Sequence, residues 1–207
     1  MFITFEGGEG AGKTTLMQQV ENQLKDRCSL LITREPGGTI FGEKARQLVL
    51  ENRDDFILSP VAEMLLYLTS RAQNLHEKIL PALKRGELVL CDRFSDSTIA
   101  YQGVGRELGY EYVTQCALLA VRNVQPDLTF YIDLDPEIGL NRLIERQKGK
   151  EELYDRIEKE KLDFHNRTRE GYHMLYRDYP ERIVLLDGTL SVEELTELSM
   201  KEIEKRL

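Results

Sequence analysis

The chain has 207 residues, 41% of them apolar, and a formal charge of −8. This length and apolar content suit one domain with a packed core, and the negative charge argues against a protein that binds nucleic acid through broad phosphate neutralisation. No apolar run is long enough to span a membrane, and because the amino terminus leads directly into an apolar segment, we expect no cleavable leader.

The first predicted elements are a strand, a glycine-rich turn and an amphipathic helix. After the strand-prone FITF, residues 7–14 read GGEGAGKT, with two glycines five apart followed by lysine and a hydroxyl residue, which is the Walker A pattern. Backbone N–H groups of such a loop converge on phosphate oxygens, Lys13 can reach the terminal phosphates, and the Thr14 hydroxyl can bind Mg²⁺. A surface glycine turn could match the same spacing, but the flanking strand and helix favour a phosphate-binding loop. The predicted ATP-binding residues are Gly7, Gly8, Glu9, Gly10, Ala11, Gly12, Lys13, Thr14 and Thr15.

A second apolar run, Ser29 to Thr33, ends at a tight loop that contains Pro36 and two glycines. A helix is predicted near residues 42–51, and a longer helix begins at Ser59-Pro60, with a kink near Pro81. Tyr67 and Arg71 are four residues apart on this longer helix, so both could contact one flat ligand. A half-buried tyrosine beside a surface arginine fits the same spacing.

The third run, Glu87 to Asp92, ends in a carboxylate at the Walker B position, followed directly by Arg93. Asp92 could therefore hold Mg²⁺ together with Thr14. Two further runs, 128–134 and 182–186, precede helices with clear amino-terminal caps. Five short strands separated by helices predict an α/β fold of the P-loop NTPase type, in which a five-stranded parallel sheet has helices on both faces.

Residues 142–156 are rich in charge and contain one glycine. Such a run is usually a solvated face. We favour a short mobile lid carrying basic residues, because the predicted phosphate site has no arginine in its P-loop. The whole chain, 1–207, is then one P-loop domain with this lid.

The cysteines are Cys28, Cys91 and Cys116, an odd number at wide spacings. This pattern predicts neither a disulfide framework nor a zinc site, and it suits a reducing compartment. We expect three buried thiols and a cytoplasmic protein.

Several motifs together resemble those of bacterial thymidylate kinases over nearly the whole chain. They are FEGGEGAGKTT (5–15), TREPGGT (33–39), SRAQ (70–73), DRFSDSTIAYQG (92–103), DLDPEIGL (133–140), DRIE (155–158) and FHNRTREGY (164–172). The resemblance implies a homodimer that transfers the γ-phosphoryl group of ATP to dTMP with Mg²⁺. Another nucleoside monophosphate kinase is the nearest alternative. A nucleotide-binding switch protein would need a guanine-reading Asn-Lys-x-Asp stretch, which the sequence lacks.

The resemblance also implies roles for individual residues. Arg93 would clamp the dTMP phosphate, Glu9 would bind the sugar 3′-hydroxyl, and Tyr101 would exclude a 2′-hydroxyl. Tyr67 would stack on thymine and Arg71 would read its carbonyl group. The implied substrate-binding residues are Glu9, Pro36, Tyr67, Arg71, Arg93, Ser97, Thr98, Tyr101 and Gln102.

Two positions depart from the family pattern. Gly10 stands where part of the family has a P-loop arginine, so the lid should supply that charge, with Arg146 and Arg156 favoured over Lys148 and Lys150 for their guanidinium geometry. Ser70 replaces a common aspartate before Arg71, which leaves the support of that arginine open. The predicted catalytic residues are Lys13, Arg93, Arg146 and Arg156.

Overall fold

A five-stranded parallel sheet forms the centre of the computed structural model, which describes residues 1–52, 57–148 and 155–207. The strands are β1 (Phe2–Gly7), β2 (Leu30–Arg34), β3 (Leu88–Asp92), β4 (Leu128–Asp133) and β5 (Ile183–Asp187). Their order in the sheet is β2-β3-β1-β4-β5. Because β1 lies between β3 and β4, the loop that follows it opens at the middle of the sheet's carboxyl edge. The predicted parallel sheet is confirmed.

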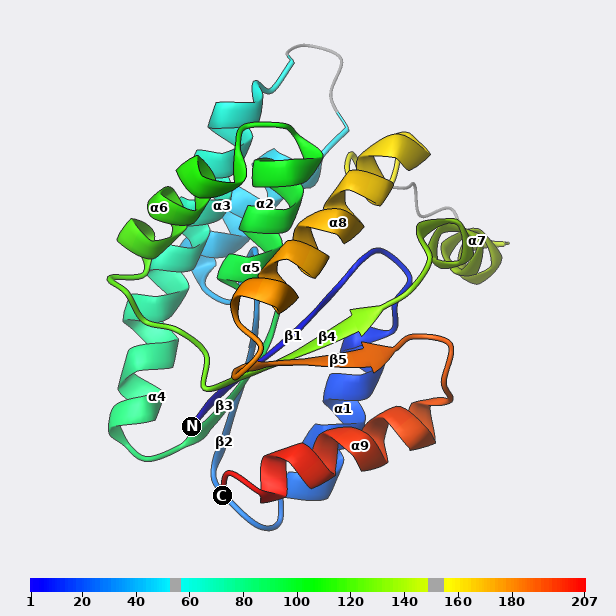
Figure 1. Ribbon diagram of the computed structural model, residues 1–207. Helices are drawn as coiled ribbons and strands as arrows, with labels where there is room; N and C mark the ends of the chain where they lie inside the picture. The colour runs from blue at the N-terminus through cyan, green and yellow to red at the C-terminus, as the bar shows by residue number, and fades with distance from the viewer. Residues whose placement is uncertain (53–56, 149–154) are drawn as a thin grey trace.

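Helices cover both faces of this sheet (Figure 1). They are α1 (Lys13–Leu24), α2 (Ile40–Leu50), α3 (Pro60–Asn74), α4 (Leu80–Lys84), α5 (Ser95–Thr98), α6 (Tyr110–Ala120), α7 (Pro136–Gln147), α8 (Leu162–Asp178) and α9 (Val192–Glu204). Figure 1 shows α1 and α9 on one side of the sheet and α3, α5, α6 and α8 on the other. The structure is therefore the predicted three-layer fold.

Side chains of the central strand alternate between the two layers, as the pleat of a strand requires. Ile3 and Phe5 are fully buried in the cluster formed with α1 and α9. Phe2 points to the opposite layer, where its ring meets that of Phe94 edge to face with centroids 4.9 Å apart. Glu6 lies on the same side as Phe2, so a carboxylate is buried beneath the helices of that layer.

Two π-helical segments interrupt the helices of that layer. One, η1 (Leu75–Ile79), joins α3 to α4 and precedes Pro81, near which the sequence predicts a kink. The other, η2 (Ile99–Gly105), continues α5 and carries Tyr101 and Gln102. Such π-helical turns are often found at functional sites.

The three cysteines differ in their burial. Cys91 is buried in β3, but Cys28 and Cys116 are partly exposed, so the prediction of three buried thiols is wrong for two of them. Cys28 follows the end of α1 in a turn, and Cys116 lies on the partly exposed α6, where the sheet does not cover it. Within the described ranges, no helix is both long and apolar enough to cross a membrane.

Candidate active site

A cavity of about 450 Å³ lies at the carboxyl edge of the sheet, between the P-loop, the loop after β2, α3, η2 and α7. Most residues predicted from the sequence line it: Glu9, Gly10, Gly12, Lys13, Thr14, Thr15, Pro36, Tyr67, Arg71, Asp92, Arg93, Ser97, Thr98, Tyr101, Gln102 and Arg146. Open parallel sheets bind ligands at this edge. The structure thus brings the predicted phosphate and acceptor residues into one cavity.

The P-loop forms the end of the cavity that suits a polyphosphate. Gly12 has a φ of 93° and precedes α1 at the N-cap, and since glycine has no side chain, the first N–H groups of the helix stay available to an anion. The Lys13 ammonium donates to the backbone oxygen of Gly8 at 2.7 Å. Burial, followed by the nearby Arg93 charge, lowers the pKa of Lys13 to about 8. A bound phosphate would stabilise the charged form of this lysine.

Thr14 and Asp92 meet at the same end of the cavity, where the threonine hydroxyl donates to a carboxylate oxygen at 2.6 Å. A hydroxyl and a carboxylate are oxygen ligands of the kind that Mg²⁺ prefers. Among the described residues, no group of three or more His, Cys, Asp or Glu side chains could hold a metal by itself. The pair therefore fits a Mg²⁺ that takes its other ligands from substrate phosphates and water.

Arg93 lies at the end of β3 with a φ of 68°, in the left-handed region that few non-glycine residues adopt. Its backbone N–H donates to Phe5, and its guanidinium donates to Glu9 at 2.7 Å and to the Tyr101 hydroxyl at 3.0 Å. The Tyr101 hydroxyl in turn donates to Glu9 at 2.7 Å. Although burial acts to raise it, the charges of Arg93 and Lys13 lower the pKa of Glu9 to about 2. Glu9 is therefore an anion that holds Arg93 across the cavity.

Glu6 supports Arg93 from behind and was missed by the sequence-based predictions. It accepts hydrogen bonds from the Phe94 N–H at 2.6 Å, the Ser97 hydroxyl at 2.5 Å and the Tyr172 hydroxyl at 2.9 Å. The Arg93 guanidinium also donates to Ser97, at 3.2 Å, so Glu6 and Arg93 share a partner. Burial raises the pKa of Glu6 to about 7. The signal in the sequence was one carboxylate inside an otherwise uncharged strand.

Arg71 is fixed by three hydrogen bonds inside the protein. It donates to Glu35 at 2.6 Å, to the Thr98 hydroxyl at 2.6 Å and to the Phe94 carbonyl at 2.9 Å. The Arg71 and Glu35 side chains are both 1% exposed, so the alternative of a surface arginine is wrong. The support left open by Ser70 comes from Glu35, and the Ser70 hydroxyl instead accepts a hydrogen bond from the Gly37 N–H.

The lid prediction, residues 142–156, falls partly outside the described residues, because 149–154 with Lys150 are not described. Of the predicted catalytic arginines, Arg146 lines the cavity. The Arg156 guanidinium donates to Glu63 and, at 3.0 Å, to the Val49 carbonyl. Arg156 is not one of the described residues that line the cavity.

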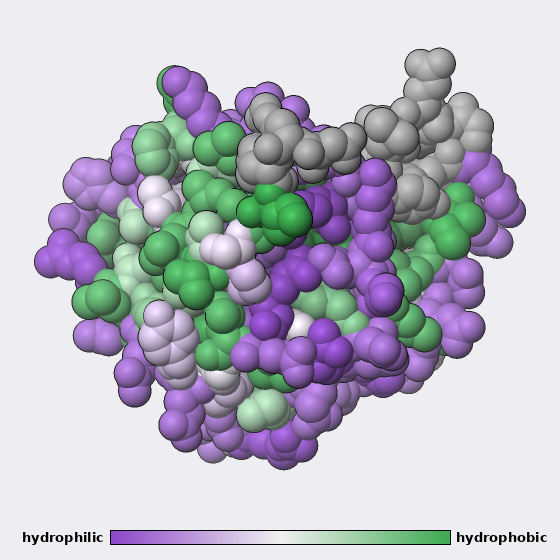
Figure 2. Space-filling model, turned by 90° about the horizontal axis from the view of Figure 1, so that it is seen from above, coloured by the Kyte–Doolittle hydropathy of each residue, from purple (hydrophilic) through white to green (hydrophobic). Residues whose placement is uncertain are grey.

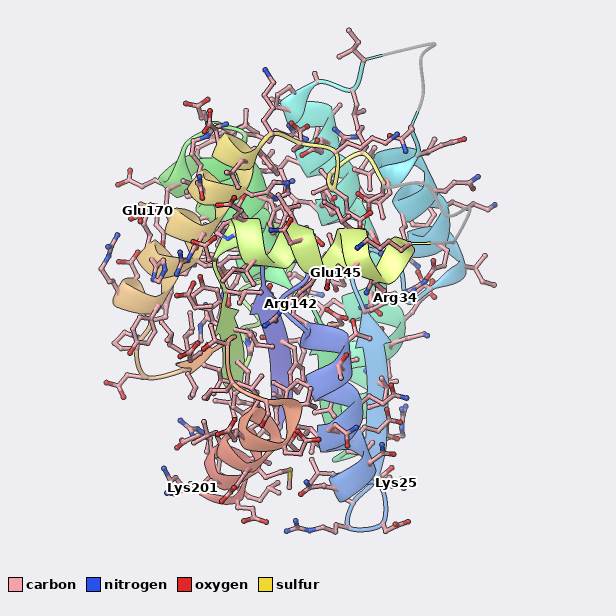
Figure 3. All side chains as sticks on the ribbon, turned by 90° about the vertical axis from the view of Figure 1, so that its right-hand side faces the viewer. Lys25, Arg34, Arg142, Glu145, Glu170 and Lys201 are labelled. Atoms are coloured by element: carbon pink, nitrogen blue, oxygen red, sulfur yellow. The ribbon has the colours of Figure 1, made fainter. Side chains whose placement is uncertain are left out.

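Further arginines line the cavity that the sequence-based predictions did not assign to it. Arg142 lies beneath α7 on the side of α1, and Arg34 lies at the carboxyl end of β2 (Figure 3). Arg46 donates to the Pro36 carbonyl at 3.1 Å. For Arg34, the position directly after a predicted strand was a usable signal, and Arg142 is the first residue of the predicted lid. Arg46 occurs in a helix without a motif. The cavity wall thus carries more basic than acidic side chains, although the chain as a whole is negative.

Gly10 packs directly against α7. It has a φ of 68°, and a Cβ atom at this position would lie 2.1 Å from the backbone oxygen of Gly139. A Cβ at Gly139 would lie 2.2 Å from the backbone oxygen of Glu9. Position 10 therefore has no room for a side chain, which explains why this P-loop cannot carry an arginine there.

The chain is similar to known proteins over almost its full length. A family model described as thymidylate kinase matches residues 5–198. A thymidylate kinase of Caldanaerobacter subterraneus subsp. tengcongensis is 45% identical over 207 residues, covering 100% of this chain and 96% of the relative. One from Acholeplasma laidlawii is 44% identical over 208 residues, covering 100% of both. The crystal structure of thymidylate kinase from Ehrlichia chaffeensis superposes with a TM-score of 0.78 at 29% identity, covering 99% of this chain and 98% of that one.

Proposed function

Because this chain belongs to the thymidylate kinase family, we propose that it is one kinase domain, residues 1–207, that phosphorylates dTMP to dTDP with ATP as the donor. The observation that carries the proposal is the single cavity with a P-loop at one end and the Arg93 and Arg71 clusters at the other. One end suits a polyphosphate donor, and the other suits an acceptor with a phosphate and a polar base.

At the donor end, the N–H groups of the P-loop and the Lys13 ammonium would bind the ATP phosphates. Thr14 and Asp92 would hold a Mg²⁺ ion, whose charge neutralises the β- and γ-phosphates when it is bound. Phosphoryl transfer depends mainly on positioning and electrostatic stabilisation. No general base is required, because the acceptor phosphate is already anionic.

At the acceptor end, Arg93 would bind the dTMP phosphate with its planar fork, while Glu9 and Tyr101 would contact the sugar. Their mutual hydrogen bonds support this assignment, because they hold all three groups at the wall of the cavity. Tyr67 would stack on the base and Arg71 would donate to a base carbonyl. Pro36, Ser97, Thr98 and Gln102 would complete the acceptor site.

Closure of α7 would bring further positive charge to the transferred group. Arg146 is supported by its place in the cavity wall, and Arg142 lies on the same helix and lines the same cavity. Arg156 would have to leave Glu63 before it could act. We therefore rank Arg146 above Arg156 as the lid arginine.

The deciding experiment compares nucleoside monophosphates as acceptors, with ATP and Mg²⁺, by measuring ADP release. We expect dTMP to give the highest kcat/KM, with transfer lost when EDTA removes the metal. A higher kcat/KM with another monophosphate would assign the chain to a different kinase specificity. Nucleotide binding without transfer to any acceptor would favour a switch protein instead.

We also propose a homodimer through α3 and α6, which contact each other. Figure 2 shows hydrophobic side chains gathered on the side of the molecule where Figure 1 places these two helices. Exposed apolar side chains of these two helices are Val61 and Leu65 of α3 and Tyr112 and Leu119 of α6, with Leu119 82% exposed. Light scattering on the parent and Leu65→Glu proteins tests this, since loss of a dimer in the variant is expected.

The proposed location is the cytoplasm. The three cysteines are free, which suits a reducing compartment.

A further inference from the structure

Glu63 lies on α3, one helical turn before Tyr67, and its side chain is 1% exposed. Three groups from distant parts of the chain donate to its carboxylate. They are the Gln102 amide nitrogen at 2.8 Å, the Arg106 guanidinium at 3.1 Å and the Arg156 guanidinium. Of these partners, Gln102 lines the acceptor end of the cavity.

The two guanidinium groups keep Glu63 ionised. Burial acts to raise the pKa of Glu63, but the hydrogen bond and charge of Arg106 and the charge of Arg156 leave it below the ordinary value. An ionised carboxylate only accepts hydrogen bonds. Gln102 must therefore turn its amide nitrogen toward Glu63, because the opposite orientation would bring two oxygens together at a site where Gln102 is 1% exposed.

This orientation decides what Gln102 offers to a ligand. With its amide nitrogen bonded to Glu63, Gln102 can present its amide oxygen to the cavity, and its second N–H lies beside that oxygen. Arg71 lines the same cavity and can only donate hydrogen bonds. Together the two residues match a base edge on which a ring N–H lies next to a carbonyl. They oppose an edge with a bare ring nitrogen next to an amino group.

We propose that Glu63 is a positioning residue that fixes the Gln102 amide, and that it thereby makes the site select a dioxopyrimidine over an aminopyrimidine. The inference rests on the proposed function and adds to it a residue that does not touch the substrate. Because Glu63 also holds Arg106 and Arg156, its replacement will affect folding stability as well. Its test therefore needs a selectivity measurement.

The sharpest measurement compares dTMP with 5-methyl-dCMP. The two acceptors have the same sugar, phosphate and methyl group, and they differ only at positions 3 and 4 of the base. In Glu63→Gln the new carboxamide can donate as well as accept, so the Gln102 amide can turn over. We expect the ratio of kcat/KM for dTMP to that for 5-methyl-dCMP to fall about tenfold, through a higher KM for dTMP. The KM for ATP should stay within about twofold of the parent value, because Glu63 has no described contact with the P-loop residues that would bind ATP.

Glu160→Gln is the matched control. Glu160 also pairs with Arg106, at 2.5 Å, but it makes no contact with Gln102 among the described interactions. Removing its charge perturbs the same arginine and should leave the acceptor ratio unchanged. A ratio lowered equally by Glu160→Gln would show that the effect comes from Arg106, and the proposal would be wrong.

Two further variants cover the case in which Glu63→Gln folds poorly. Glu63→Asp keeps the charge between the guanidinium groups but withdraws the carboxylate by one methylene, so the ratio should fall in the same direction. Gln102→Leu removes the amide and should lower the ratio by about as much as Glu63→Gln. An unchanged ratio in Gln102→Leu, or in a folded Glu63 variant, overturns the proposal.

These results are separable from the proposed function. If the parent protein shows no preference for dTMP over 5-methyl-dCMP, the base specificity of the proposed function fails before any variant is made. If the parent prefers dTMP and the Glu63 variants keep that preference, only the role of Glu63 is refuted.

Discussion

The two ends of the cavity are built in different ways. At the donor end, Thr14 and Arg146 are exposed, and the Lys13 ammonium is hydrogen-bonded to a backbone oxygen of its own loop. At the acceptor end, Arg71 and Glu35 are buried together and Arg93 is linked to Glu9. The acceptor end is thus ordered by the protein's own charges, whereas the donor end needs ligand phosphates to complete it. Changes at the donor end should mainly affect turnover, and changes at the acceptor end should mainly affect affinity and selectivity.

The largest effect is expected at the donor end from Lys13→Ala. Removing the Lys13 ammonium should lower kcat about a thousandfold, because this ammonium would stabilise the negative charge that develops on the transferred phosphoryl group. The dTMP affinity measured by calorimetry and the Tm should change little, since the acceptor contacts remain. Near-parent turnover by a folded variant would refute the P-loop assignment.

The next effect concerns the lid. Arg146→Ala should lower single-turnover transfer on the order of a hundredfold while leaving equilibrium ATP binding nearly unchanged, because the contact forms on closure. Arg156→Ala is the comparison, and we expect it to act less on transfer than on the KM for dTMP, since its guanidinium bonds Glu63. If the double variant transfers phosphate at the parent rate, the lid supplies no catalytic charge.

A smaller effect, on the KM for dTMP and not on kcat, is expected from Arg93→Lys at the acceptor end. Arg93→Lys should raise the KM for dTMP about tenfold or more, because an ammonium cannot reproduce the two-pronged contact. The KM for ATP should be unaffected, which steady-state kinetics with each substrate varied in turn will show. An unchanged KM for dTMP would show that Arg93 only positions the P-loop and does not bind the dTMP phosphate.

The last effect at the acceptor end concerns stability and not kinetics, and it is a dependence of the free energy of unfolding on pH. Burial raises the pKa of Glu6 from 4.5 to about 7, so the folded protein binds this proton more tightly than the unfolded chain. The resulting stabilisation is complete below pH 4.5 and is lost as the pH rises to about 7. Urea unfolding should therefore show the parent losing stability relative to Glu6→Gln as the pH rises through this range.

Thr4→Val is the control for this measurement. It removes a buried hydrogen bond to Thr129 from the same face of β1 without removing a titrating group. Its stability should change by the same amount at every pH. A parent and a Glu6→Gln protein with parallel pH profiles would contradict the raised pKa.

The sequence predicted the sheet, its helices and most of the cavity wall, because these depend on local patterns. A run such as Glu87 to Asp92 reveals a strand and the carboxylate at its end, and the Walker A spacing reveals a phosphate loop. The family resemblance added the acceptor residues. Each of these signals is contained within a short stretch of chain.

The supporting contacts could not be predicted in this way, because they join residues far apart in the sequence. Tyr172 and Glu6 are separated by 166 positions, and Arg156 and Glu63 by 93. No short stretch of the sequence indicates that Glu35 binds Arg71, or that Arg156 binds Glu63 and does not line the cavity. Such pairs follow from the topology, which places α8 beside β1, and the residues around Arg156 and the loop after β2 beside α3.

The contact between Gly10 and Gly139 has a consequence for how this enzyme can evolve. With each glycine pressed against the backbone of the other's segment, neither position can gain a side chain while the other stays as it is. An arginine at position 10 would need the first turn of α7 to move away, and that movement would carry Arg142 and Arg146 with it. The charge on the transferred phosphoryl group can be met by an arginine in the P-loop or by arginines on α7. With this backbone, the two arrangements are therefore mutually exclusive. A lineage passing from one to the other must therefore move the backbone of the P-loop and of the first turn of α7 apart, and not only exchange the side chain at position 10.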